Sequence, residues 1–63
     1  MKYIRCKIGT MPLSIVLHVK NPIKVGHWIE VKEVEPGRKV NMWQTSLQLH
    51  VDEICDGFIK VSK

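Results

Sequence analysis

Polar and apolar residues alternate most regularly in the segment from Trp43 to Ile54. Three apolar side chains at every second position fall on one side of an extended chain; they are Leu47, Leu49 and Val51. The polar residues that flank and separate them fall on the other side; they are Ser46, Gln48, His50 and Asp52. A period of two is typical of a β-strand with one face in the core. The segment therefore predicts a central strand of a small sheet.

Four other segments show a similar alternation, and they span residues 2–8, 13–19, 28–34 and 58–61. The side chains predicted to face inward are Ile4, Cys6 and Ile8, then Leu13, Ile15, Leu17 and Val19, then Ile29 and Val31, and finally Ile59 and Val61. In the second segment this places Val16 and His18 on the outer face. Val40 and Met42 indicate a further extended stretch, out of phase with Leu47. We therefore expect five or six short strands.

Turn signals and composition support the same interpretation. Asn21-Pro22 and Asp56-Gly57 are typical turn dipeptides, and Glu35-Pro-Gly-Arg38 fits a type II turn because proline presets φ and glycine accepts a positive φ. Ile and Val together supply fifteen residues, and the chain has no alanine. Branched side chains fit a pleated sheet, whereas alanine is the best helix former. The predicted fold class is all-β.

Length limits the architecture to one small domain, residues 1–63, because a chain of this size buries only about 60% of its unfolded surface. Short strands joined by tight turns favour a small barrel or a strongly bent antiparallel sheet of the SH3-like or Sm-like kind, since closure removes exposed edges. The alternative is an intertwined dimer, in which strands of a second copy enlarge the core. The pattern is compatible with both.

Positive charge is concentrated toward the N-terminus of a chain whose net charge is +4. Five cations precede the first acidic residue, Glu30; they are Lys2, Arg5, Lys7, Lys20 and Lys24. Tyr3, Arg5 and Lys7 share the outward face of the first predicted strand, and a ring beside two cations can stack on bases and neutralise phosphates. Lys60 joins this face if the first and last strands are neighbours, as in many small barrels. The other interpretation is a solvated face that prevents edge pairing.

Reactive residues do not form a recognisable motif. The histidines and cysteines lack the short paired spacing of metal sites; they are His18, His27, His50, Cys6 and Cys55. We expect no metal, no cofactor and no catalytic residue, hence a protein that is not an enzyme, because so short a chain has little room for a substrate pocket. Two cysteines are too few for a disulfide framework, and no apolar run reaches the roughly 20 residues of a membrane span. The expected location is the cytoplasm.

Two segments resemble a known family. Met1-Lys-Tyr-Ile-Arg-Cys-Lys-Ile-Gly9 and Leu47-Gln-Leu-His-Val-Asp-Glu-Ile54 are loosely similar to the first and last strands of the carbon storage regulators. The members of that family are small domain-swapped dimers that bind messenger RNA leaders, so the resemblance implies RNA as a partner and a homodimer. It covers about a quarter of the chain. Val51 stands where the family has a basic RNA-contacting residue, and the motif that joins the family's last two strands is absent.

Two classes of function follow. The first is a small basic regulatory module that binds nucleic acid, with RNA as the expected ligand; the residues assigned to binding are Tyr3, Arg5, Lys7 and Lys60. The second is a protein-interaction module, such as a small inhibitor or adaptor that docks on a larger protein partner. Trp28 is the candidate contact for that second class, because it shares parity with Glu30 and Lys32 and is expected on the surface.

Overall fold

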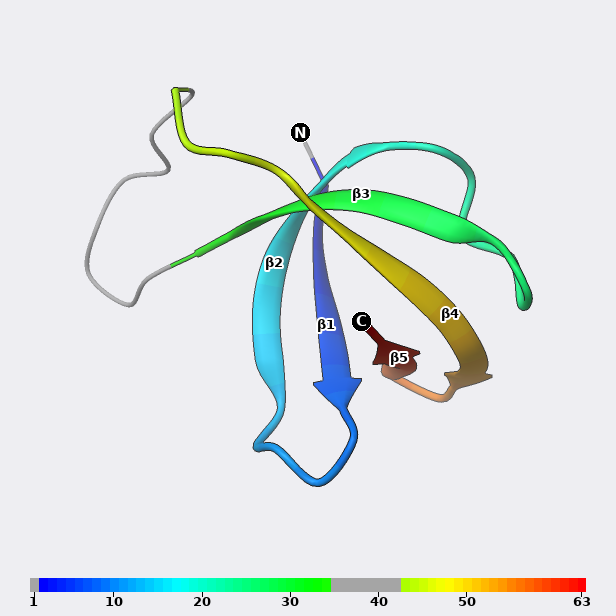
Figure 1. Cartoon of the computed structure of the whole chain (residues 1–63). Coiled ribbons are helices and arrows are strands. Elements are labelled where there is room, and N and C mark those ends of the chain that lie inside the picture. The colour runs from blue at the N-terminus through cyan, green and yellow to red at the C-terminus, as the bar shows by residue number, and fades with distance from the viewer. Residues whose placement is uncertain (1, 35–42) are drawn as a thin grey trace.

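Five β-strands form the part of the chain that the computed structural model describes, residues 2–34 and 43–63. They are β1 (Lys2–Ile8), β2 (Ser14–Lys20), β3 (Trp28–Glu33), β4 (Leu47–Cys55) and β5 (Phe58–Ser62) (Figure 1). The described residues contain no helix. The turn expected at residues 35–38 and the extended stretch expected at Val40 and Met42 lie outside the described residues. The prediction of an all-β fold is confirmed.

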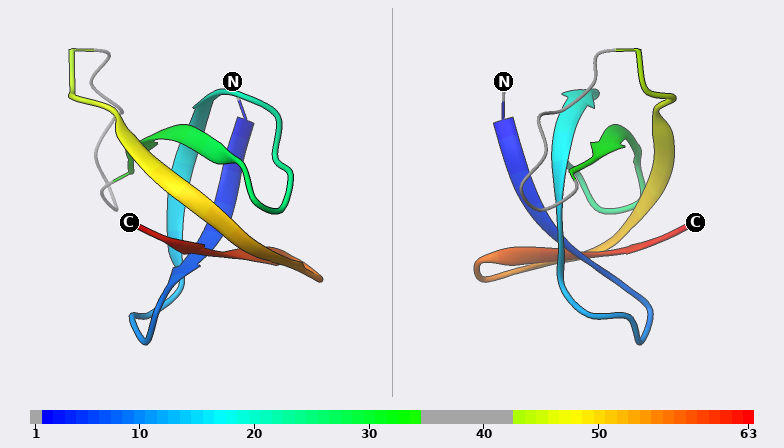
Figure 2. Two further views of the ribbon diagram at one scale, coloured as in Figure 1. Left: turned by 45° about the vertical axis from the view of Figure 1, so that its right-hand side comes forward. Right: turned by 90° about the vertical axis from the view of Figure 1, so that its left-hand side faces the viewer.

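The five strands close into a barrel in the order of the sequence. Neighbouring strands are antiparallel, except that β1 and β5 pair in parallel and close the sheet. Figure 2 shows the wall formed by β3 and β4 lying opposite the β1–β2 hairpin. Because one chain closes the sheet, no strand from a second copy is needed to pair its edges. The architecture is consistent with the SH3-like or Sm-like small barrel expected from the sequence.

All five strands contribute to a single apolar core. Its buried members are Cys6, Val16, Ile29, Val31, Leu49, Val51, Ile59 and Val61. Four partly buried side chains pack against them; they are Ile4, Ile8, Ile23 and Leu47. The inward faces predicted for β1, β3, β4 and β5 are therefore confirmed, since each predicted residue of those strands lies in or against this core.

The predicted inward face of β2 is wrong. Val16 is only 3% exposed and belongs to the core, whereas Ile15 is 49% exposed. Ile4 of β1 lies directly opposite Val16, and residues directly opposite each other share a face, so the inward Ile4 brings Val16 inward with it. This parity depends on the number of residues in the β1–β2 turn, where the Met11 N–H donates to the Ile8 carbonyl at 2.9 Å. A slip of one residue in a hairpin moves every side chain to the other face.

Leu17 is buried, as expected, but on the outside of the barrel. Its neighbours on the same face are Tyr3 of β1 and Lys32 of β3. Lys32 is itself buried, and its Nζ donates a hydrogen bond of 3.0 Å to the carbonyl oxygen of Gln44. A long aliphatic stem can cover apolar surface while its ammonium group binds an acceptor. Leu17 and the Lys32 stem thus form a small apolar contact separate from the core.

Candidate nucleic-acid interface

The outward row of β1 is exposed as the sequence predicts. Ile4 and Cys6 turn inward, which leaves Tyr3, Arg5 and Lys7 on the surface. The Tyr3 side chain is 55% exposed. Among the described residues, the ion pairs include neither Arg5 nor Lys7. Both cations of this row are therefore available to an anionic ligand.

Closure of the barrel places a second strand beside this row. Lys60 of β5 lies directly opposite Lys7, and just before the first paired residues Arg5 and Phe58 line the same hollow. Lys60 therefore joins the row, as it was expected to do if the first and last strands were neighbours. We call this surface the basic face; its members are Tyr3, Arg5, Lys7, Phe58 and Lys60. Phe58 was not among the binding residues assigned from the sequence, because its place beside Arg5 follows only from closure.

A bulge in β4 brings an acidic residue, Glu53, beside the basic face, and Asp52 also lines a hollow with Lys7 and Lys60. The β4–β5 register shifts between Val51 and Glu53, which brings Glu53 opposite Lys60. The Lys60 Nζ lies 3.4 Å from Glu53 Oε2, and both side chains are more than half exposed. Such a surface pair contributes only about 0.2–1 kcal/mol and weakens with salt. A phosphate can compete for Lys60, but Lys60 is a weaker contact than Arg5 or Lys7.

Exposed apolar side chains lie along the other edge of the basic face. Ile15 of β2 lies directly opposite Arg5 and points to the same side. Leu13 and Met11, in the connection between β1 and β2, are also about half exposed. We call Met11, Leu13 and Ile15 the apolar border. Sequence reasoning missed it because Leu13 and Ile15 had been assigned to the core; the signal that could have found it is Val16, an apolar residue on the opposite face of the same strand.

Two hollows adjoin the basic face on either side of Phe58. One, of about 380 Å³, is lined by residues that include Tyr3, Arg5 and Phe58. The other, of about 410 Å³, lies over the β1–β2 connection and is lined by Lys7, Phe58 and residues 10–13. Phe58 lines both. An aromatic ring and a cation thus meet at each hollow, which is a chemistry suited to a planar, negatively charged ligand.

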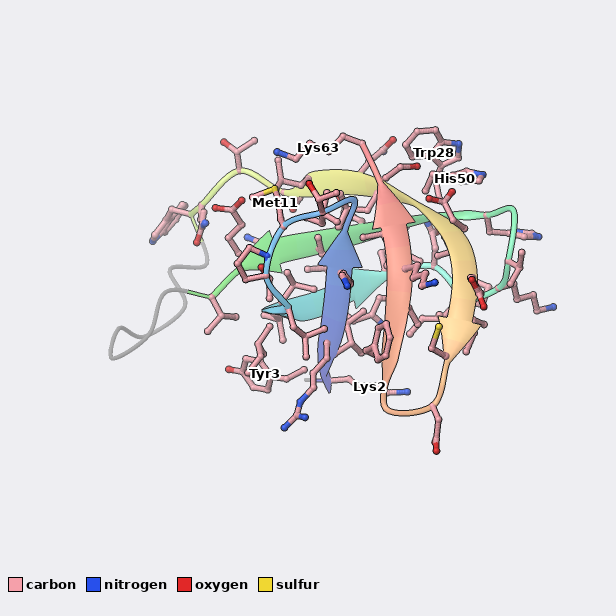
Figure 3. The ribbon with its side chains drawn as sticks, turned by 90° about the horizontal axis from the view of Figure 1, so that it is seen from below. Lys2, Tyr3, Met11, Trp28, His50 and Lys63 are labelled. Atoms are coloured by element: carbon pink, nitrogen blue, oxygen red, sulfur yellow. The ribbon has the colours of Figure 1, made fainter. Side chains whose placement is uncertain are left out.

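Trp28 lies apart from the basic face, beside His50 (Figure 3). It is exposed, as expected, and its ring centroid is 5.3 Å from that of His50 in an edge contact. His50 Nδ1 lies 2.6 Å from Asp52 Oδ1, and the Ser62 hydroxyl donates to the same oxygen at 3.2 Å. The serine therefore donates to the carboxylate and not to the imidazole, which differs from a serine activated by histidine. The hydrogen bonds fix the imidazole ring against Trp28.

The pKa of Asp52 is lowered, chiefly by its hydrogen bond to His50, which outweighs the opposing effect of desolvation; the hydrogen bond from Ser62 and the charge of His50 lower it further. A carboxyl whose pKa is lower in the folded state stabilises the fold above its unfolded pKa, and this contribution is lost as pH falls through the folded pKa. Asp52→Asn should therefore lower the melting temperature at neutral pH, and the difference from the wild type should shrink in acid. Thermal unfolding between about pH 7 and pH 2 measures this trend.

Asp56→Asn is the matched control, because it removes an exposed carboxylate from the β4–β5 turn. It should leave the pH dependence close to that of the wild type. Equal acid sensitivity of the wild type and Asp52→Asn would show that the His50 contact does not stabilise the fold.

Among the described residues, the remaining histidine side chains and the cysteines do not gather into a metal or redox site. The described residues contain no group of three or more His, Cys, Asp or Glu side chains that could hold a metal ion. His18 Nε2 instead lies within hydrogen-bond distance of the Asn21 carbonyl oxygen. Both cysteines are free thiols. Burial raises the pKa of the Cys6 thiol to about 11, while Cys55 is partly exposed.

Comparisons with known proteins yield no match: no family model, no curated protein and no solved structure is similar to this chain. The local similarity to the carbon storage regulators is thus not supported by a family match. Among the described residues, no helix is long and apolar enough to cross a membrane. The fold and the geometry of the basic face remain the basis for any assignment of function.

Proposed function

We propose that this protein is a small regulatory module that binds nucleic acid, with RNA as the expected ligand and the cytoplasm as its location. The observation that carries the proposal is the parallel pairing of β1 with β5. It joins Arg5 and Lys7 to Lys60, and it places Phe58 on the same surface as Tyr3. Three cations and two rings are thus gathered on one side of the barrel.

The arrangement of charges and rings suits a single-stranded nucleic acid. Residues two apart on a β-strand are about 6.6 Å apart, so Arg5 and Lys7 present charges in a row that an extended phosphate backbone can follow. Each phosphate that they neutralise releases condensed counterions. The exposed ring of Tyr3 offers a stacking surface, and base stacking on aromatic side chains tolerates any sequence. Unpaired bases accessible to such rings are the usual target of RNA-binding modules.

Salt dependence tests the proposal. About three phosphate contacts to a single strand should give a slope near −2 in a plot of log affinity against log salt concentration. Arg5→Ala combined with Lys7→Ala should weaken binding to all sequences alike and flatten the slope to about −0.7, because only one contact remains. Fluorescence anisotropy with a mixed single-stranded RNA pool, at about 50 and 200 mM salt, measures both quantities.

Lys24→Ala combined with Lys63→Ala is the control, since it removes the same charge from the β2–β3 connection and the C-terminus. It should leave the slope near that of the wild type. If the wild type binds the pool at low salt no better than a neutral β domain does, the basic face is only a solvated surface and the proposal fails.

The apolar border favours a second candidate function, a protein-interaction module such as a small inhibitor or adaptor. Exposed apolar side chains beside cations are typical of docking surfaces for larger proteins. Trp28, on another side of the barrel, would be a second contact. A partner that is retained after nuclease treatment and lost on Ile15→Asp would support this function, and loss of the partner on nuclease treatment would support the first.

A further inference from the structure

The seam between β1 and β5 is paired along only part of its length. Cys6–Ile8 pair with Ile59–Val61, whereas β1 begins at Lys2. Both strands begin on the side of the barrel where Lys2 and Tyr3 lie (Figure 3). The hollow of about 380 Å³ lies at this unpaired end and is lined from β1, the β2–β3 connection and the β4–β5 hairpin. We call it the seam pocket.

The lining of the seam pocket is apolar inside and aromatic and cationic toward the solvent. Ile4 and Ile23 pack against the core. Exposed Tyr3 and Arg5, with half-buried Phe58, belong to the basic face. None of the described residues that line the pocket is acidic, although Asp56 lies in the adjacent turn. An apolar hollow with two rings and a guanidinium group suits a flat, uncharged ring system that is attached to a negative charge.

We propose that the seam pocket binds one unstacked base of a single-stranded nucleic acid, while the adjoining phosphates lie on Arg5 and Lys7. The inference rests on the proposed function and specifies how the ligand is held. A base is favoured over an apolar side chain of a protein because Arg5 lines the pocket and the same face continues to Lys7 and Lys60. A base in a duplex is already stacked and paired, so it cannot enter without the cost of unstacking. The site therefore selects single strands over duplexes.

Cys55 lines the seam pocket and provides a direct reporter of its occupancy. It is partly exposed, whereas Cys6 is fully buried and burial raises its thiol pKa to about 11, so a thiol reagent should modify only Cys55 in the folded protein. A mixed RNA pool of about ten nucleotides, supplied at about ten times its dissociation constant, leaves about one eleventh of the protein unbound. Alkylation of Cys55 by N-ethylmaleimide should then slow about tenfold.

Two further ligands separate base binding from phosphate binding. An abasic oligomer of the same length and charge, and a duplex of the same length, should bind through salt-dependent contacts but leave the alkylation rate of Cys55 within about twofold of that of the unbound protein. If the single strand binds with the expected salt slope and yet leaves Cys55 equally reactive, the seam pocket is not a base site while the proposed function stands. If none of the three ligands binds, the proposed function itself fails.

Tyr3→Ala tests the same inference without the thiol. Loss of the ring should weaken binding of the single-stranded pool by about 5- to 150-fold at every salt concentration and leave the salt slope unchanged. Binding of the abasic oligomer should not change, because it has no base to stack. Trp28→Ala is the matched control, since Trp28 is 49% exposed against 55% for Tyr3 and lies away from the pocket. An equal loss for the abasic oligomer and the base-bearing strand would overturn the assignment.

Discussion

Leu49→Ala is expected to lower the free energy of unfolding by about 2 to 5 kcal/mol. Leu49 lies in β4, is only 1% exposed, and belongs to the core to which all five strands contribute. The substitution removes a large apolar side chain and leaves a cavity that a small closed barrel has little freedom to fill. Domains of this kind have roughly 5 kcal/mol to lose, so much of the variant should be unfolded at 25 °C.

Gln48→Ala is the control for this prediction. Gln48 precedes Leu49 in the same strand but is exposed on the outer face, opposite Glu30 of β3. It should change the free energy of unfolding by no more than about 0.5 kcal/mol. Urea denaturation, followed by circular dichroism, gives both values. Similar unfolding midpoints for the two variants would show that the faces of β4 are wrongly assigned.

Val16→Asp is expected to destabilise the barrel by more than about 4 kcal/mol, because it places a carboxylate without a partner among apolar side chains. Ile15→Asp, one residue away, should cost less than about 1 kcal/mol. Its carboxylate would be solvated on the outer face and would lie directly opposite Arg5, which is a favourable cross-strand pair. The alternation in the sequence predicts the reverse order, so this pair of variants tests the one face that the sequence assigned wrongly.

Thermal and urea denaturation of the two variants decide between the assignments. A folded Val16→Asp protein together with an unfolded Ile15→Asp protein would mean that β2 pairs with β1 in a register shifted by one residue. Leu17 would then belong to the core, as the sequence alone suggests. The result also bears on function, because a folded Ile15→Asp protein is the variant needed to test the apolar border.

The basic face gathers like charges that do not stabilise the fold. Lys7 and Lys60 lie directly opposite each other on β1 and β5, and like charges in that position repel. Glu53 offsets the repulsion only through an exposed contact. A bound polyanion would neutralise both lysine charges and so remove the repulsion. Binding of nucleic acid, the proposed function, would therefore relieve this unfavourable pair. Paired cations also keep a strand from adding to other chains, the role that a purely solvated face would have.

Several features of the fold follow from the sequence by itself. The period-two pattern in β1, β3, β4 and β5 identified the strands and their inward faces, because one side of each is clearly more apolar than the other. The excess of branched residues and the lack of alanine indicated an all-β chain. The outward row Tyr3, Arg5 and Lys7 was visible for the same reason, since it alternates with Ile4 and Cys6.

Tertiary structure decided what lies across from each residue. β2 has apolar residues on both faces, so its alternation was ambiguous, and only the pairing of Ile4 with Val16 determines which face is buried. The bulge that brings Glu53 to Lys60 depends on how β4 and β5 pair, and the place of Phe58 beside Arg5 depends on closure between the two ends of the chain. Periodicity in one strand reports burial of that strand, but register and closure are set by turn lengths and by contacts between strands distant in sequence. The basic face and the seam pocket exist only once those contacts have formed.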